Sequence, residues 1–135
     1  MRIKIFKEKN IFSPKGNVLT YLKKGQKGYD GFGEVYFSTI KPNKIKGWKK
    51  HKKMSMNIYV IVGSAKFVFY NTKNKKFSYK ILNESNPQRL FIGPNTWFAF
   101  KNISKKKTII VNFSNIKHSD KEVLNKTLKE IQYDW

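Results

Sequence analysis

The stretch that decides the fold is Lys46–Asn57, KGWKKHKKMSMN, which leads directly into Ile58–Gly63, IYVIVG. Its first part is polar and basic, and its second part is apolar and rich in β-branched residues. This pattern predicts a strand with polar groups along one face, then a turn, then a buried strand.

Side chains alternate between the two faces of a strand, so the polar stretch is expected to present two different sets of residues. One predicted face carries Gly47, Lys49, His51 and Lys53, and the other carries Lys46, Trp48, Lys50 and Lys52. If the first face lines the interior of a barrel, Lys49 and His51 lie side by side in a pocket. We take this pair as the candidate catalytic residues.

Alternating or β-branched and aromatic runs predict strands along the rest of the chain. Their ranges are 2–6, 18–22, 34–40, 58–62, 65–70, 77–82, 89–92, 97–102 and 108–113. Gly63-Ser64, between two of these runs, suggests a hairpin. In the tail, Ser119–Glu122 has the form of a capping box, and the apolar residues that follow recur at helical spacing, which predicts a short C-terminal helix.

Many short strands and one terminal helix predict an all-β fold, a closed or sandwiched antiparallel domain. The chain has 135 residues and no internal repeat, so we expect a single domain over residues 1–135. It contains no cysteine, which excludes disulfides and thiolate metal sites. We find neither a signal peptide nor an apolar run long enough to cross a membrane, so we expect a cytoplasmic protein with no membrane partner.

The net charge of +21 comes almost entirely from lysine. A charge of this size attracts anionic partners such as nucleic acid or a nucleotide, although a lysine-rich genomic composition would produce it as well. Only two residues are arginine, which makes a sequence-reading nucleic-acid protein a poor fit. Twelve lysines and no acidic residue lie between Glu34 and Glu84, which favours an anionic ligand near this half of the molecule.

Five segments, in this order and spacing, resemble the dTDP-4-dehydrorhamnose 3,5-epimerase group of the cupin superfamily. They are Gly33–Ser38, Ile45–Met54, the Gly63 turn, Ile92–Phe100 and Tyr133–Trp135. The resemblance covers roughly residues 30 to 135. It implies a cupin-type jelly-roll β-barrel, usually a homodimer, whose open end takes a nucleotide-linked keto-sugar in deoxysugar or surface-polysaccharide biosynthesis.

The resemblance carries over to the site residues only in part. Lys46 stands where the family has a phosphate-binding Arg, Lys49 stands where it has the catalytic His, and His51 matches the second His of the cupin pattern. Phe98 replaces the His of the second motif, and no tyrosine occurs at residues 114–117, where the epimerases have their catalytic Tyr. Metal-binding cupins need about three protein ligands, whereas the matching positions here include one histidine, so we expect no metal and no other cofactor.

His51 and Lys49 could share acid–base or enolate-stabilising work beside a keto group, or they could be remnants of a decayed site. Lys46 and Arg89 are the candidates for contact with a diphosphate. The other candidate substrate-binding residues are Trp48, Asn57, Tyr36, Tyr59, Trp97 and Asn112, each of which could equally be a packing or turn residue. For His118, before the capping box, a surface or capping role is favoured.

Three hypotheses follow. The first is a metal-independent epimerase or isomerase that acts on a nucleotide-diphosphate keto-sugar and abstracts a proton next to the keto group. The second is a non-catalytic cupin that binds a sugar nucleotide or assists another sugar-modifying enzyme. The third is a basic β-barrel that binds nucleic acid, which would need aromatic residues interleaved with exposed lysines on one face.

Overall fold

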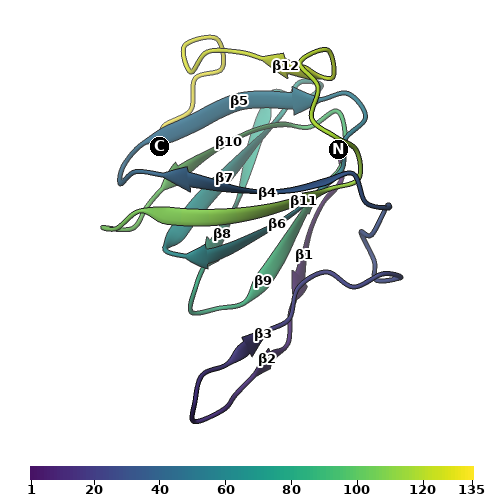
Figure 1. Ribbon diagram of the computed structural model, residues 1–135. Helices are drawn as coiled ribbons and strands as arrows, with labels where there is room; N and C mark the ends of the chain where they lie inside the picture. Colours follow the sequence, from purple (N-terminus) through teal and green to yellow (C-terminus); the bar gives the residue numbers. More distant parts are fainter.

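The computed structural model describes all of residues 1–135, and every regular element in it is a strand (Figure 1). The strands are β1 (Ile3–Lys7), β2 (Asn10–Ile11), β3 (Val18–Leu19), β4 (Glu34–Ile40), β5 (Ile45–His51), β6 (Met56–Val62), β7 (Ser64–Asn71), β8 (Lys76–Asn83), β9 (Gln88–Ile92), β10 (Trp97–Asn102), β11 (Thr108–Ser114) and β12 (Val123–Asn125). The structure contains no helix that is capable of spanning a membrane.

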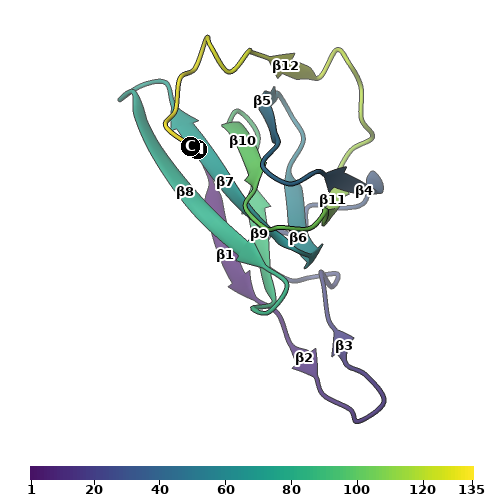
Figure 2. The ribbon, with the colours of Figure 1, turned by 90° about the vertical axis from the view of Figure 1, so that its left-hand side faces the viewer.

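Two five-stranded antiparallel sheets make up the body of the molecule. The first has the order β1-β9-β6-β11-β4, and the second has the order β12-β5-β10-β7-β8. Figure 2 shows the two sheets facing one another, with the short hairpin β2–β3 projecting from one end. The space between the sheets is filled by a core of 12 buried hydrophobic residues. The predicted all-β jelly-roll barrel is therefore confirmed.

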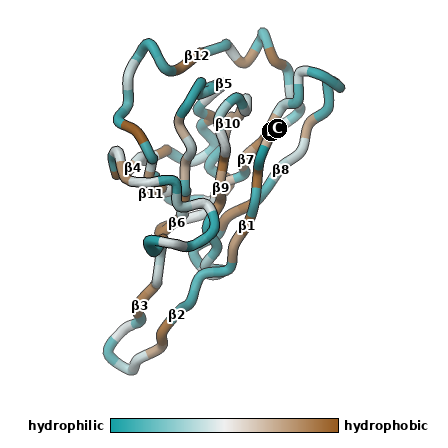
Figure 3. Tube along the Cα trace, turned by 90° about the vertical axis from the view of Figure 1, so that its right-hand side faces the viewer, coloured by the Kyte–Doolittle hydropathy of each residue, from teal (hydrophilic) through white to brown (hydrophobic).

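Alternation explains which side chains enter the barrel. On β4, Tyr36, Ser38 and Ile40 point inward, whereas Val35 and Phe37 point out. In Figure 3 the hydrophobic stretches lie mainly on the strands of the barrel and on hairpin β2–β3.

The hairpin predicted at Gly63-Ser64 is wrong. β6 pairs with β9 and β11, while β7 pairs with β8 and β10, so the two strands belong to different sheets. Gly63 has a φ of +87°, and a Cβ at this position would lie 2.2 Å from Thr108 Oγ1. The chain turns sharply against β11 here and crosses between the sheets, which favours glycine.

The predicted C-terminal helix is also wrong. Residues 123–125 form β12, which pairs with Lys49–His51 on the edge of β5. The Trp48 and Lys126 backbones extend this pairing with two reciprocal hydrogen bonds of 2.9 and 3.0 Å. Ile131 then packs in a cluster with Trp48, and its carbonyl accepts a 2.9 Å bond from the indole N–H. The open edge and the apolar outer face of the second sheet thus override a local helical pattern.

Candidate active site

A bulge in β5 sets the orientation of the β5 residues that line the pocket described below. Lys49 lies opposite Phe98 and Lys46 lies opposite Phe100, so two residues of β5 oppose the single residue Ala99 of β10. A side chain at Gly47 would collide with Ala99, because its Cβ would lie 2.3 Å from the Ala99 Cβ. The extra residue brings Lys46 to the same side as Lys49, which simple alternation did not predict.

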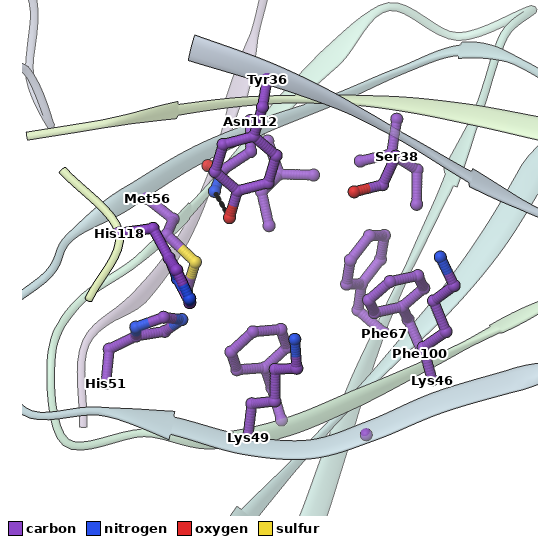
Figure 4. A pocket seen from close by; sticks show the side chains of 14 residues that line it. Tyr36, Ser38, Lys46, Lys49, His51, Met56, Phe67, Phe100, Asn112 and His118 are labelled. Atoms are coloured by element: carbon purple, nitrogen blue, oxygen red, sulfur yellow. Dashed lines mark hydrogen bonds between the residues drawn. The ribbon is translucent and has the colours of Figure 1, made fainter. Parts of the chain in front are cut away.

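The pocket lies between the two sheets at one end of the barrel and has a volume of about 120 Å³. It contains both candidate catalytic residues, and Figure 4 shows their side chains pointing into it. The polar and charged side chains in its lining are those of Tyr36, Ser38, Lys46, Lys49, His51, Asn112 and His118. The remaining wall is largely aromatic and aliphatic, with Phe67, Phe98 and Phe100 prominent.

His51 is buried and is held by a carboxylate from a distant part of the chain. Its Nδ1 lies 2.7 Å from Oε2 of Glu122, and its side chain is 4% exposed. Its ring stacks near Phe98, with centroids 6.3 Å apart. When Glu122 accepts the Nδ1 hydrogen, Nε2 is the unprotonated nitrogen, and His51 faces the pocket as a base.

Glu122 itself is fixed by the turn between β5 and β6. Its Oε1 accepts backbone N–H groups from Lys53 at 2.6 Å and Met54 at 2.9 Å. Burial alone would raise the pKa of Glu122, but these two hydrogen bonds and His51 together outweigh burial and lower it. The carboxylate is therefore charged at neutral pH and orients the imidazole.

Tyr36 and Asn112 form a second polar pair on the opposite wall. Asn112 Nδ2 donates to the Tyr36 hydroxyl at 2.6 Å, which leaves the phenol hydrogen free to donate into the pocket (Figure 4). Burial raises the pKa of Tyr36, and the bond from Asn112 opposes this only in part. The buried Asn112 Oδ1 has no hydrogen-bond partner, so it is an available acceptor.

The two lysines of the pocket differ in their contacts. Lys46 Nζ donates to the carbonyl of Thr39 at 2.7 Å, which ties β5 to β4 at the rim. Lys49 is exposed, and its ammonium makes no salt bridge. Its charge is thus available to a ligand in the pocket.

Arg89 and Asn57, both predicted to bind substrate, lie outside the pocket on the outer face of the first sheet. Leu90 and Ile92 point into the core, so alternation turns Arg89 outward. Arg89 Nε lies 2.6 Å from Glu8 Oε1, and its other N–H groups donate to Asn57 Oδ1 and the Lys27 carbonyl. This cluster clamps residues 27 and 28 onto the sheet, because Asn57 Nδ2 also donates to the carbonyl of Gly28.

Trp48, Trp97 and Tyr59 also lie outside the pocket. Trp48 and Trp97 are buried on the outer face of the second sheet beneath the C-terminal tail. Nζ atoms of Lys50 and Lys126 lie 5.3 and 5.4 Å from the Trp97 ring. Tyr59 packs edge-on against Tyr21 on the outside of the first sheet. Of the predicted substrate-binding residues, the structure brings Lys46, Tyr36 and Asn112 together with Lys49 and His51.

The pocket does not offer the ligands that a metal cupin requires. Its two imidazoles are those of His51 and His118, the neighbouring walls are Lys49, Met56 and Phe98, and Nδ1 of His51 is bound to Glu122. No group of three or more His, Cys, Asp or Glu side chains comes together in the structure. This donor set does not fit a catalytic metal ion.

Three residues of the site were missed from the sequence. Ser38 shares the inward parity of Tyr36 on β4, so alternation could have placed it in the pocket. Glu122, assigned to a helix cap, holds His51 from 71 residues away, and no local pattern signals such a contact. His118, favoured as a surface or capping residue, lines the pocket although it is also 44% exposed.

Comparison with solved structures places this site in a known fold. The chain is 25% identical to a dTDP sugar isomerase from Desulfovibrio desulfuricans, with a TM-score of 0.91 over 98% of this chain and 90% of that one. It is 18% identical to QdtA, a sugar 3,4-ketoisomerase from Thermoanaerobacterium thermosaccharolyticum in complex with TDP, with a TM-score of 0.80 over 96% and 91% of the chains. A mutant of QdtA is described in complex with TDP-4-keto-6-deoxyglucose.

A dTDP-4-dehydrorhamnose 3,5-epimerase from Sulfolobus tokodaii is 19% identical, with a TM-score of 0.85 over 98% of this chain and 80% of that one. At 18 and 19% identity, these likenesses show a shared fold, the one that the resemblance to the epimerase group implied. No curated protein sequence matches the chain. The family model described as "FdtA: WxcM-like, C-terminal" matches residues 1–129, so the chain belongs to this family.

Proposed function

We infer that the protein is an isomerase or epimerase of a nucleotide-diphosphate keto-sugar and that it works without a metal ion. The observation that carries this inference is the His51–Glu122 pair, which directs the other imidazole nitrogen, Nε2, toward a pocket of polar and aromatic residues. The family match and the dTDP-sugar isomerases and epimerases among the structural neighbours support the same substrate class.

In the proposed first step, Nε2 of His51 removes the proton from a carbon next to the keto group. The electrons of the C–H bond form a C=C bond, and the carbonyl oxygen becomes an enolate oxygen. Glu122 stabilises the imidazolium that results, because its pKa is lowered and it stays charged. This pair is therefore suited to a reversible proton transfer.

The enolate needs compensating groups on the other side of the pocket. The Tyr36 hydroxyl can donate a hydrogen bond to it, since Asn112 already supplies the bond that the phenol oxygen accepts. The Lys49 ammonium provides a positive charge without a competing carboxylate. The free Asn112 Oδ1 can accept from a sugar hydroxyl and so orient the ring.

The nucleotide diphosphate is proposed to lie toward Lys46 and the basic half of the molecule. Lys46 is held at the rim by the Thr39 carbonyl, and its ammonium has two further hydrogens to donate. Arg89 takes no part in this proposal, because it lies outside the pocket and is bound to Glu8, Asn57 and the Lys27 carbonyl.

An enolate of this kind has two outcomes. Return of the proton to the other face of the same carbon inverts that carbon. If the carbon that lost its proton bears a hydroxyl group, return of the proton to the former carbonyl carbon moves the keto group, because the hydroxyl proton passes to the enolate oxygen and the hydroxyl oxygen becomes the new carbonyl oxygen. One base, His51, can remove a proton and return it to the adjacent carbon on the same face, so we favour movement of the keto group. The non-catalytic alternative leaves the buried His51–Glu122 pair without a role.

The substrate and outcome can be tested together with TDP-4-keto-6-deoxyglucose and proton NMR of the sugar ring. The proposal expects the protein to convert this compound to a 3-keto isomer or a ring epimer. A panel of keto-sugar nucleotides that bind but are returned unchanged would leave the non-catalytic cupin as the better account.

The homodimer implied by the resemblance belongs to this proposal. Phe32 and Phe37 are 66% and 65% exposed, and Val35 beside them is also exposed. Hairpin β2–β3 projects from the barrel with Ile11, Phe12, Val18 and Leu19 all exposed. Apolar surface of this extent supports an association of two copies. The molar mass in solution, measured by light scattering, distinguishes a dimer from a monomer of 16.0 kDa.

A further inference from the structure

His118 is the only histidine besides His51, and both line the same pocket. In Figure 4 the two imidazoles point toward the same part of the cavity, His51 from β5 and His118 from the segment after β11. They differ in access to water, because His51 is 4% exposed and His118 is 44% exposed. The pocket thus contains one shielded and one solvent-accessible imidazole.

The position of His118 is set by its backbone. Its N–H donates to Oε1 of Glu34 at 2.9 Å. Upstream, the Asn115 side chain accepts the Ser55 N–H at 2.8 Å, and downstream, Glu122 binds the turn after β5. The segment is therefore anchored before, at and after His118, and it presents the imidazole to the pocket.

A surface ion pair does not explain this placement. His118 Nε2 lies 3.3 Å from Oδ1 of Asp120, whose side chain is fully exposed. Pairs of this kind contribute little to stability. Nδ1 of His118 has no protein partner, and the imidazole reaches solvent at the mouth of the pocket.

We propose that His118 is a second catalytic residue, the general acid that protonates the carbonyl oxygen of the substrate while His51 removes the proton from the neighbouring carbon. This inference rests on the function proposed above. The C–H electron pair forms the C=C bond, the carbonyl π pair moves to oxygen, and that oxygen takes the proton of the His118 imidazolium. One imidazole gains a proton as the other loses one, so the charge of the pocket and substrate together does not change.

The other groups that face His118 are less suited to this transfer. Burial raises the pKa of Tyr36, which makes its phenol a hydrogen-bond donor rather than a source of protons. Lys49 is assigned above to the charge that develops on the substrate, Glu34 accepts the His118 backbone N–H, and Asp120 lies beside His118 Nε2. Imidazole is the side chain that gives and takes a proton near neutrality.

The test uses the full chain with TDP-4-keto-6-deoxyglucose and the variants His118→Ala and His118→Gln. We expect kcat to fall by about 100-fold in both, which is typical of a lost general acid, with KM close to the wild-type value. Added imidazole should restore kcat in His118→Ala, where it can enter the vacated space, and not in His118→Gln. Lys117→Ala, at an exposed position on the same segment, is the matched control and should retain wild-type kcat without a response to imidazole.

A wild-type kcat in His118→Ala would overturn the inference, and so would a rise in KM alone. A loss of kcat that imidazole does not reverse would also overturn it, provided that the variant has the wild-type melting temperature. Each of these results leaves the proposed function standing, because the wild-type protein is active in all of them. A wild-type protein that converts no keto-sugar nucleotide would overturn the proposed function and this inference together.

Discussion

The protein contains two buried ion pairs with similar geometry and very different surroundings. His51 Nδ1 lies 2.7 Å from Glu122 Oε2, and Arg89 Nε lies 2.6 Å from Glu8 Oε1. The two terminal nitrogens of Arg89 donate to Asn57 and to the Lys27 carbonyl, whereas His51 keeps one ring nitrogen toward the pocket. The first pair is proposed to do chemistry, and the second clamps the segment before β4 to the barrel.

The comparison teaches that residue type and burial are not sufficient to identify a functional charge. Arg89 is 2% exposed and paired, and from the sequence it was, with Lys46, a candidate for contact with a diphosphate. What separates the two pairs is whether a donor or acceptor is left over after the protein's own contacts are satisfied. Four predictions follow from this distinction, in order of decreasing effect.

His51→Asn should abolish most of the turnover with little effect on the fold. Asparagine retains a polar side chain near Glu122 but cannot accept a proton from carbon at neutral pH. We expect kcat with TDP-4-keto-6-deoxyglucose to fall by about 1,000-fold, within the range for loss of a general base. Steady-state kinetics measures the loss, and a thermal melt serves as the control for folding. A variant with kcat within a few-fold of wild type would show that His51 is not the base.

Arg89→Met should have the opposite effect, a loss of stability without a loss of turnover. It leaves Glu8 buried without its partner, so the free energy of unfolding should fall by about 3–5 kcal/mol. The folded fraction should keep the wild-type kcat, because Arg89 does not reach the pocket. Urea unfolding measures the first effect, and turnover per folded molecule measures the second. If stability is retained while the KM for the nucleotide sugar rises, Arg89 contacts the ligand after all.

Glu122→Gln should affect both turnover and stability, each to a smaller degree. Glutamine can still accept the N–H groups of Lys53 and Met54 but removes the charge beside His51. The lost charge-assisted hydrogen bond, on the order of 1.5 kcal/mol, corresponds to a decrease in kcat of about tenfold. Equal kcat in wild type and Glu122→Gln would show that the Glu122 carboxylate does not assist His51 as the base.

The same substitution changes the response to acid. The pKa of Glu122 is lowered in the folded protein from its ordinary value of 4.5, so this group stabilises the fold above pH 4.5. That contribution disappears as the pH falls below 4.5 and through the lowered pKa. Melting temperatures measured across this range should fall less steeply for Glu122→Gln than for wild type. Melting temperatures that fall equally steeply with pH in the two proteins would mean that ionisation of Glu122 does not contribute to stability.

Much of the barrel could be predicted from the sequence because its strands alternate. Residues 34–40 and 97–102 were predicted with the bounds that the structure has, and 108–113 falls one residue short. The same rule, applied to Leu90 and Ile92, would have turned Arg89 out of the barrel. For the site, Lys49 and His51 were placed in one pocket from their spacing alone.

The remaining features depend on contacts between distant segments. Lys46 enters the pocket because Gly47 and Trp48 together oppose Ala99, and a bulge of this kind is not visible in one strand. The tail forms β12 rather than a helix because β5 offers it an open edge. Glu122, which looked like a capping residue, is used by His51 and the turn after it.

The central claim is that His51 moves a proton on a carbon next to a keto group. The most direct measurement is NMR of TDP-4-keto-6-deoxyglucose in deuterium oxide with wild-type protein and with His51→Asn. Wild type should introduce deuterium at a ring carbon beside the keto group or convert the sugar, and His51→Asn should do neither. An unchanged, unlabelled sugar in the presence of wild-type protein that binds it, or equal labelling by His51→Asn, would show that His51 does not move this proton.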